Sequence, residues 1–333
     1  MDVLKIASSE RGLKTRSDKV PMDAAGAYNG QTVPAKHLGW LPDLPDVRDY
    51  TPVQDVIEPE KVAMGVDETV KHMLSRLGID GPRTALPPRT DLRQWFSPVE
   101  DQGSIGSCTA NAGVALLEYY ERRAFGKHID ASRMFLYKAT RNLLHWQGDT
   151  GAYLRSTMKA MALFGVPPEE YCPYVLQDFD KEPNAFCYAF AANYQSISYY
   201  RLDLPSLSRT MLLDQIKTNL NKGQPSMFGF TVYDSIGQSG RGGEIPFPQK
   251  TESVKGGHAV VAVGYDDDYE IRHPDNPQLS TRGALMIRNS WGTGWGMQGY
   301  GWLPYNYVLA GIAIDWWCLI ASKWLDTGAF ENT

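Results

Sequence analysis

The pattern of apolar residues changes near residue 195, and this change constrains the fold more than any other feature. Before it, apolar positions recur at helical spacing over residues 107–125 and in "SRMFLYKATRNLL" and "AYLRSTMKAMALFG". After it, β-type runs such as "MFGFTVY", "HAVVAVGYD" and "ALMIRNSW" alternate with turns rich in Gly, Pro and Asp. A helical half followed by a β half predicts an α+β protein with a cleft between two lobes.

Composition excludes several function classes. The net charge is -5 and no basic run occurs, which argues against a nucleic-acid partner. The N-terminal twenty residues lack the uninterrupted apolar segment of a Sec signal peptide. The most apolar run, "YVLAGIAIDWWCLIASKW", is interrupted by Asp315, so we interpret it as a buried strand and not as a membrane span. We expect a monomer, cytoplasmic or exported by a route without a Sec signal peptide.

The four cysteines are too few and too dispersed for a disulfide scaffold. Cys172 and Cys187 lie fifteen residues apart, either as two half-buried thiols or as a bridged pair. A bridge closing a loop of that size would contribute roughly 3 kcal/mol on the chain-entropy model. It would also imply export, which the N-terminus does not support.

The N-terminal region shows one unusual pattern, "LPDLPDVRDYTP" at 41–52, after 36 residues without periodicity. Its prolines favour polyproline II, whose three residues per turn would align Leu41, Leu44, Val47 and Tyr50 on one edge. We expect this apolar stripe to contact the main body near the cleft. It either packs there as a simple arm or also occupies or flanks a functional groove. Further on, "DETVKHMLSRLG" predicts a short helix capped by Asp67.

Cys108 stands between a glycine-rich bend and the predicted helix 107–125. A cysteine nucleophile must be a thiolate, and both a helix N-terminus and a nearby imidazolium lower the thiol pKa. Cys108 has the first of these by position, which makes it a candidate nucleophile.

His258 opens a run that must be largely buried, and Asn289 ends the next such run. If the two runs form an antiparallel hairpin through the polar loop 266–283, His258 and Asn289 become neighbours. The amide of Asn289 would then orient the imidazole toward a nucleophile, as the third member of a catalytic triad does. Trp291 and Trp295 follow at once and would keep water away from that bond.

Three segments resemble the cysteine, histidine and asparagine boxes of the papain-like cysteine peptidases: "QGSIGSCTA", "GGHAVVAVGY" and "NSWGTGWGMQGYG". "LPPRTDLRQW" resembles the family's mature N-terminus, so the match covers about residues 86–310. The resemblance implies the two-lobed papain-like fold. It suggests an N-terminal extension over 1–85, a helical lobe with the nucleophile over 86–195 and a β lobe with His and Asn over 196–333.

The resemblance also implies residue roles. Gln102 corresponds to the glutamine that supplies an oxyanion donor beside the Cys108 backbone N–H. Candidate substrate-binding residues are Thr150, Gly151, Gly257 and Trp291.

Two departures separate the chain from most of the family. Ile105 and Thr109 replace the usual Cys and Trp, so a common disulfide near the active site cannot form. This is similar to bacterial-type members and fits a reducing compartment.

We expect a cysteine-type endopeptidase, or thiol protease, acting on peptides or proteins through a thioester. It would be autoinhibited as a zymogen if residues 1–85 act as a propeptide or cleft-covering arm. Two alternatives are a catalytically silent scaffold with a permanently covered cleft, and a Cys–His acyltransferase or amidase. We expect no cofactor and no metal, because Asp266–Asp268 has the pattern of a solvated turn.

Overall fold

The helical half of the chain is built on one long buried helix, which begins at Cys108. The computed structural model describes residues 38–321, apart from gaps at 58, 60–61, 63–67, 77, 80–84, 193–196 and 240–241. Its α-helices are α2 (Val70–Arg76), α3 (Cys108–Phe125), α4 (Arg133–Leu143), α5 (Leu154–Phe164), α6 (Ala185–Ala191), α7 (Arg209–Asn221) and α8 (Tyr305–Leu309). Short 3-10 turns lie at Arg93–Trp95, Glu169–Tyr171, Leu176–Asp178 and Asp234–Gln238.

Local chemistry explains where the helices begin and end. The side chain of Ser132 accepts a hydrogen bond from the Phe135 N–H at the start of α4. Gly126, at φ 73°, ends α3 in the left-handed region that glycine adopts without strain. The helices predicted near 107–125, 133–143 and 154–164 are therefore confirmed. The predicted cap Asp67 of α2 lies outside the described residues.

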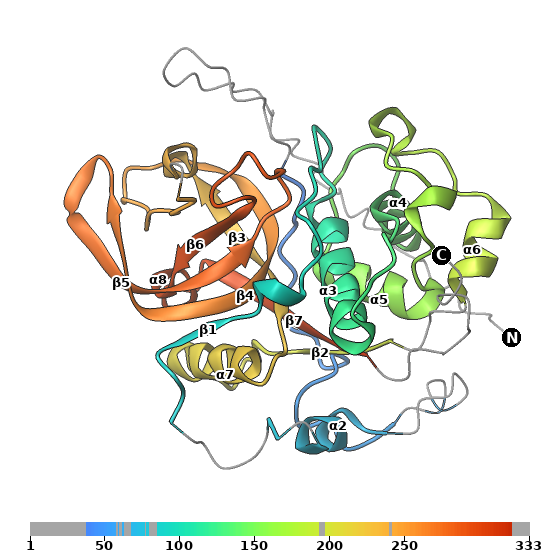
Figure 1. Ribbon diagram of the computed structural model, residues 1–333, viewed down its shortest axis with the longest axis horizontal. Helices are drawn as coiled ribbons and strands as arrows, with labels where there is room; N and C mark the ends of the chain where they lie inside the picture. Colours follow the sequence, from blue (N-terminus) through green and yellow to red (C-terminus); the bar gives the residue numbers. More distant parts are fainter. Residues whose placement is uncertain are drawn as a thin grey trace, which may run out of the picture. The chain divides into compact units, whose positions relative to one another are not determined.

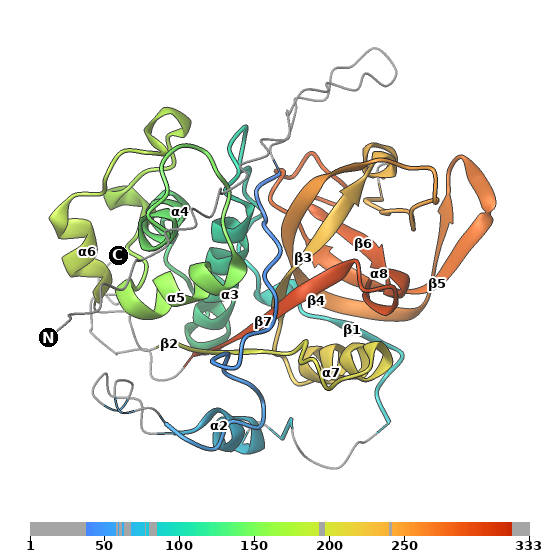
Figure 2. The same ribbon diagram turned by 180° about the vertical axis from the view of Figure 1, so that it is seen from behind.

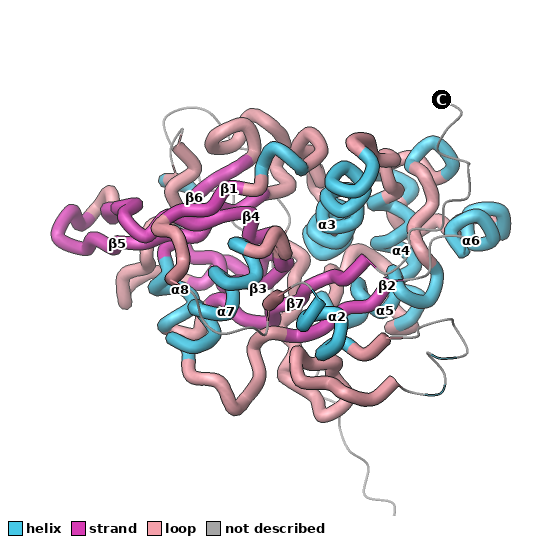
Figure 3. Tube along the Cα trace, turned by 60° about the horizontal axis from the view of Figure 1, so that its bottom comes forward, coloured by secondary structure: helices cyan, strands magenta, loops and turns pink. Residues whose placement is uncertain are grey.

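The second half of the chain forms an antiparallel sheet with the order β2-β7-β3-β4-β5-β6, and β1 pairs with β4 beside this path. Its strands are β1 (Arg89–Asp91), β2 (Ile197–Arg201), β3 (Ser226–Tyr233), β4 (Val254–His273), β5 (Asn276–Arg288), β6 (Tyr300–Pro304) and β7 (Ala313–Ala321). Figures 1 and 3 show α3 to α6 gathered on one side and β3 to β6 on the other. The α+β prediction is confirmed.

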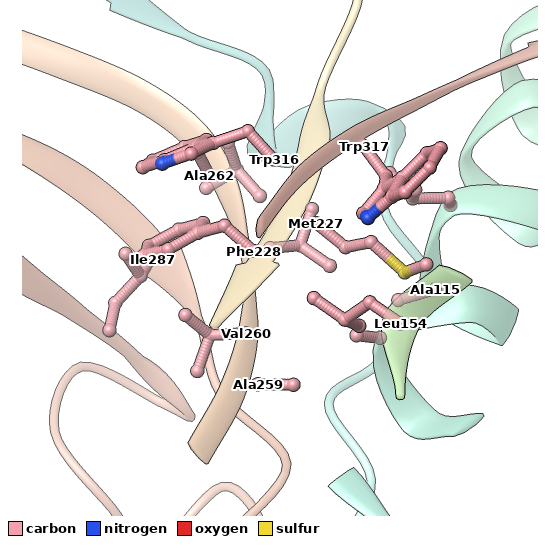
Figure 4. Packing of buried hydrophobic residues seen from close by; sticks show 14 of the residues in the cluster. Ala115, Leu154, Met227, Phe228, Ala259, Val260, Ala262, Ile287, Trp316 and Trp317 are labelled. Atoms are coloured by element: carbon pink, nitrogen blue, oxygen red, sulfur yellow. The ribbon is translucent and has the colours of Figure 1, made fainter. Parts of the chain in front are cut away.

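The core has two compartments because strand residues alternate between the faces of the sheet. On β3, Met227 points toward Ala115 and Leu154 on the helices, and Phe228 points to the other face (Figure 4). There the ring of Phe228 stacks on Trp316, with the centroids 3.8 Å apart. The sheet therefore buries both faces, which explains its nearly continuous apolar runs.

One sequence prediction, the polar loop between the two buried runs, needs adjustment. The expected polar loop at 266–283 is mostly strand, because β4 continues to His273 and β5 begins at Asn276. Cross-strand contacts, including a hydrogen bond from the Arg282 guanidinium to Asp268, line this exposed ribbon.

The proposed lobe boundary at 195/196 falls in a gap between described residues. β1 comes from the segment assigned by sequence to the helical lobe, but it pairs with the sheet.

All four cysteines are free thiols. Cys172 and Cys187 are not bridged, and the Cys187 thiol donates instead to the Tyr171 carbonyl oxygen at 3.3 Å. No helix among the described residues is both long and apolar enough to cross a membrane.

Candidate active site

The Cys108 side chain is fully buried at the first turn of α3. Burial raises the pKa of its thiol to about 11, and four backbone N–H groups partly offset this rise. Two belong to Cys108 and Thr109 at the helix N-terminus, which is the pKa-lowering device expected from the sequence. The others come from Ala259, which follows His258 on β4, and from Gly39.

His258 and Asn289 meet as the hairpin prediction required. The β4–β5 register pairs Val261 with Arg288, and His258 Nε2 lies 2.7 Å from Asn289 Oδ1. Because an amide oxygen only accepts hydrogen bonds, Nε2 carries the hydrogen and Nδ1 is left as a base. Nδ1 is buried and has no hydrogen-bond partner among the described residues. A buried unpaired nitrogen costs about 1–3 kcal/mol, which marks this ring edge as functional.

The surroundings of His258 keep its ring neutral and shielded. Its ring stacks on Trp291, with the centroids 4.7 Å apart, and Trp291 meets Trp295 edge to face. Burial lowers the pKa of His258 to about 4, and the hydrogen bond with Asn289 acts in the opposite direction. Burial therefore disfavours both the imidazolium and the thiolate in this state.

Gln102 is fully buried and held at both ends of its carboxamide. Its Oε1 accepts a hydrogen bond from the Ser290 hydroxyl at 2.6 Å, and its Nε2 donates to the Ile105 carbonyl at 2.9 Å. The backbone carbonyl of Gln102 also accepts from the Tyr174 hydroxyl. Ser290 and Tyr174 are supporting residues that the sequence analysis missed, although Ser290 directly follows the Asn289 that it did find.

The N-terminal arm, which we define as residues 38–52, passes directly over these groups. Figures 1 and 2 show it in blue between α3 and α5 on one side and β3 and β4 on the other. The Trp40 N–H donates to the Gly257 carbonyl, the Leu41 N–H donates to the Ala152 carbonyl, and the Ala152 N–H donates to Gly39. The arm thus pairs by its backbone with the residue that precedes His258 and with the segment that leads into α5.

The Trp40 side chain packs in a slot whose floor is formed by Gly229 and Gly257. A Cβ atom at Gly229 would lie 1.9 Å from the indole ring, and one at Gly257 would lie 2.6 Å from it. At the end of the slot, the indole Nε1–H donates to Asp315 Oδ2 at 3.1 Å. The Asp315 carboxyl is buried, and the slot therefore has a polar end and an apolar floor.

Comparisons with known proteins agree with this geometry. A family model described as papain family cysteine protease matches residues 86–320. The chain belongs to the papain family of cysteine proteases.

Its relatives within the papain family include viral and bacterial proteins. An uncharacterised peptidase C1-like protein of Acanthamoeba polyphaga mimivirus is 31% identical over 86% of this chain and 87% of its own length. The structure of xylellain, a cysteine protease from Xylella fastidiosa, matches with a TM-score of 0.64 at 32% identity, covering 87% of this chain and 98% of that one. Cathepsin K of Gallus gallus is 28% identical over 66% of this chain and 59% of its own length.

The four candidate substrate-binding residues of this papain-family chain take different positions. Gly257 and Gly151 contact the arm: Gly257 accepts the Trp40 N–H, and a Cβ atom at Gly151 would lie 2.1 Å from the Gly39 carbonyl oxygen. Trp291 covers His258. Thr150 is exposed and its hydroxyl donates to the next carbonyl. In this region the arm bonds by its backbone to Ala152, the residue that follows the predicted Thr150 and Gly151.

The arm contacts the main body at the two ends of the predicted apolar stripe, where Leu41 pairs by its backbone with Ala152 and Tyr50 packs edge to face on Tyr199, but not through its middle. Leu44 and Val47 are exposed, and only Leu41 and Tyr50 are half-buried. A turn closed by the Asp49 N–H on the Asp46 carbonyl interrupts the threefold period. Asp43 and Asp49 face inward instead, while Asp46 pairs with Arg48 on the arm itself.

Two arginines on the main body explain why aspartates of the arm, and not its central apolar residues, face inward. Arg155 on α5 binds Asp43 and Asp49, and Arg201 at the end of β2 lies 3.5 Å from Asp49. The aspartates therefore face inward toward two guanidinium groups, which leaves the apolar residues on the outside.

Acidic clusters outside this site have their own counter-charges. The carboxylates of Glu100, Asp130 and Glu169 lie close together, and Arg133 pairs with Glu100 at 2.8 Å and with Glu169 at 3.1 Å. We assign no metal to this cluster. The run Asp266–Asp268 likewise meets Arg89, Lys217 and Arg282.

Proposed function

We propose that the chain is a cysteine-type endopeptidase that hydrolyses peptide bonds through a thioester. In this proposal the N-terminal arm keeps the active site closed. The observation that carries the proposal is the His258–Asn289 hydrogen bond. In this papain-family chain, β4 carries His258 and packs against α3, the helix that begins at Cys108. The substrate is then a peptide or protein segment bound where the arm now lies.

The reaction follows from the roles of three side chains and one backbone N–H. The Cys108 sulfur attacks the peptide carbonyl carbon and forms a C–S bond, while the carbonyl oxygen takes the negative charge. The Gln102 side-chain amide and the Cys108 backbone N–H stabilise that oxyanion. The His258 imidazolium protonates the leaving amine as the C–N bond breaks. His258 then takes a proton from water, which attacks the thioester and releases the carboxylic acid and the thiol.

The arm suppresses this chemistry in two ways. It occupies the path of the substrate, because the backbone N–H groups of Trp40 and Leu41 already pair with the carbonyls of Gly257 and Ala152. It also contributes to the burial that keeps the thiol and the imidazole uncharged, because desolvation disfavours both ionised forms. Displacing the arm readmits water and favours the thiolate–imidazolium pair that nucleophilic attack needs.

The arm has the anchoring expected of a zymogen segment. Trp40 is buried in its slot, Asp49 is buried against Arg155 and Arg201, and the Arg201 N–H donates to the Tyr50 carbonyl. Activation then requires that these contacts open, whether the extension is removed or stays attached.

A thiol-directed epoxysuccinyl inhibitor tests the proposal. Full-length protein and the Gly39→Ala variant are incubated with the inhibitor and a fluorogenic peptide library. We expect stoichiometric labelling of Cys108, faster in the variant, together with peptide cleavage that Cys108→Ala abolishes. Peptidase activity that survives in Cys108→Ala would refute the assignment.

The buried anchoring of the arm also supports a second candidate, a catalytically silent scaffold whose site stays covered. Under that hypothesis no arm-opening variant or truncation gains activity, although the fold remains intact by circular dichroism. Amine incorporation without peptide cleavage would instead indicate a Cys–His acyltransferase.

A further inference from the structure

Arg155 depends entirely on the arm for its hydrogen-bond acceptors. Its Nε donates to Asp49 Oδ1 at 2.6 Å, and its Nη2 donates to Asp49 Oδ2 at 2.8 Å and to the Leu44 carbonyl at 2.6 Å. Its Nη1 donates to Asp43. Every hydrogen bond that Arg155 donates to a described residue therefore ends on residues 43–49. Within the part of the main body that the structure describes, no group accepts a hydrogen bond from Arg155.

Arg201 provides a contrast that singles out Arg155. Arg201 donates to both carboxylate oxygens of Asp203 and lies 3.3 Å from Asp315, and both carboxylates belong to the main body. Arg201 therefore keeps its counter-charge without the arm. Arg155 keeps only the ring of Trp317, 5.8 Å from the guanidinium carbon, which supports the group without neutralising it.

The position of Arg155 relates it to the path of a bound peptide. It is the second residue of α5, three residues after Ala152, which pairs with the arm backbone. Along the arm, Gly39 lies against Gly106, two residues before Cys108, and Asp43 is four residues further, on Arg155. At about 3.3 Å per residue, an extended peptide covers roughly 13 Å over this distance.

We propose that Arg155 is a specificity-determining residue that binds an acidic side chain of the substrate. This inference rests on the proposed endopeptidase function. With the arm displaced, the guanidinium takes the carboxylate of an Asp or Glu about four residues from the residue at Cys108. The arm then closes the site by imitating an acidic substrate, with Asp43 and Asp49 in place of the substrate carboxylate. The positive end of α5 adds to the attraction.

The ligand is a peptide and not a free anion because the route from the sulfur to Arg155 is lined by backbone partners. The Gly257 carbonyl and both backbone groups of Ala152 already pair with a peptide chain, the arm itself. A chain held by these groups places its side chains at fixed intervals, so one carboxylate at the correct spacing reaches the guanidinium.

The test uses the full chain with its own competing carboxylates removed, as Gly39→Ala/Asp43→Asn/Asp49→Asn. Peptides carry either Asp or Asn at one position at a time, on both sides of the scissile bond. Hydrolysis gives kcat/KM for each Asp/Asn pair. A charge-assisted hydrogen bond predicts a preference for Asp of about tenfold at one position only, which falls with added salt.

Variants at Arg155 in this background decide the assignment. Arg155→Gln should abolish the preference, and Arg155→Glu should replace it with a preference for Lys, which a purely structural role would not produce. Arg282→Gln is the matched control, since it removes an exposed arginine that pairs with Asp268 on the β4–β5 ribbon. It should keep the preference for Asp.

The outcomes separate this inference from the proposed function. Equal kcat/KM values for Asp and Asn at every position, or a preference that persists in Arg155→Gln, overturn the role of Arg155. If no peptide is hydrolysed at all, the endopeptidase proposal fails. The affinity of fluorescein-labelled Asp and Asn peptides for the same background carrying Cys108→Ala then still tests binding at Arg155.

Discussion

The indole N–H of Trp40 donates a hydrogen bond to Oδ2 of Asp315, two residues that are 275 positions apart in the chain. Asp315 has φ 64° and is buried, and its backbone N–H donates to Asp203 Oδ2. A second indole, that of Trp317, donates to Asp315 Oδ1. Residues of the main body therefore hold Asp315 in place, and the arm adds one hydrogen-bond donor to its carboxyl group, the Trp40 indole N–H.

Trp40→Phe should therefore open the arm, because it removes the indole N–H and part of the ring that fills the slot. Loss of this hydrogen bond should cost about 0.5–1.5 kcal/mol, which corresponds to a roughly 2- to 13-fold larger open population. The measurement is the rate at which iodoacetamide modifies Cys108. Trp95→Phe, which changes a partly exposed tryptophan of the 3-10 turn Arg93–Trp95, is the control. Equal modification rates for Trp40→Phe and wild type would contradict the role of the Trp40–Asp315 hydrogen bond in holding the arm.

Gly39→Ala should displace the arm for a steric reason. A Cβ atom at residue 39 would lie 1.9 Å from the Gly106 carbonyl oxygen, so the arm backbone must move away from Gly106. We expect faster epoxysuccinyl labelling of Cys108 and higher peptidase activity, with little change in thermal stability. Gly237→Ala is a matched control, because a Cβ there meets nothing within 4 Å. An inactive but folded Gly39→Ala protein would favour the silent scaffold.

The sequence predicted that His258 and Asn289 are neighbours, because their proximity depends on strand pairing. Once "HAVVAVGYD" and "ALMIRNSW" form one hairpin, His258 and Asn289 must lie together. The partners of the arm were not predictable in this way. Periodicity tells which residues share a side, but Leu44 and Asp43 compete for the inner side, and only the position of Arg155 decides between them. Asp315 was interpreted only as an interruption of an apolar run, because its partner Trp40 is remote in the chain.

Gln102→Ala, introduced into the Gly39→Ala background, should lower kcat by about 100- to 1,000-fold, the usual cost of losing one oxyanion donor. KM should change little, because the interaction strengthens mainly in the transition state. Ser290→Ala removes only the hydroxyl that fixes the Gln102 carboxamide, so a smaller loss is expected. Steady-state kinetics on one fluorogenic peptide measures both variants. An equal or larger effect of Ser290→Ala would assign Gln102 a structural role.

Glu118 on α3 should make stability depend on pH. Burial raises its pKa from 4.5 to about 7, although the Ser97 hydroxyl and the Ala131 N–H both donate to its carboxylate. Because the native state holds the proton more tightly than the unfolded state, this group stabilises the fold fully below pH 4.5. That contribution is lost as the pH rises through 7 and amounts to roughly 3 kcal/mol at most.

Urea unfolding at pH 5, 6, 7 and 8 tests this prediction. The free energy of unfolding of wild type should fall more steeply over this range than that of Glu118→Gln, which cannot ionise. Glu170→Gln, at an exposed position, is the control and should follow wild type. Parallel curves for wild type and Glu118→Gln would show that the carboxyl is already ionised in the native state at pH 5, held there by its two donors.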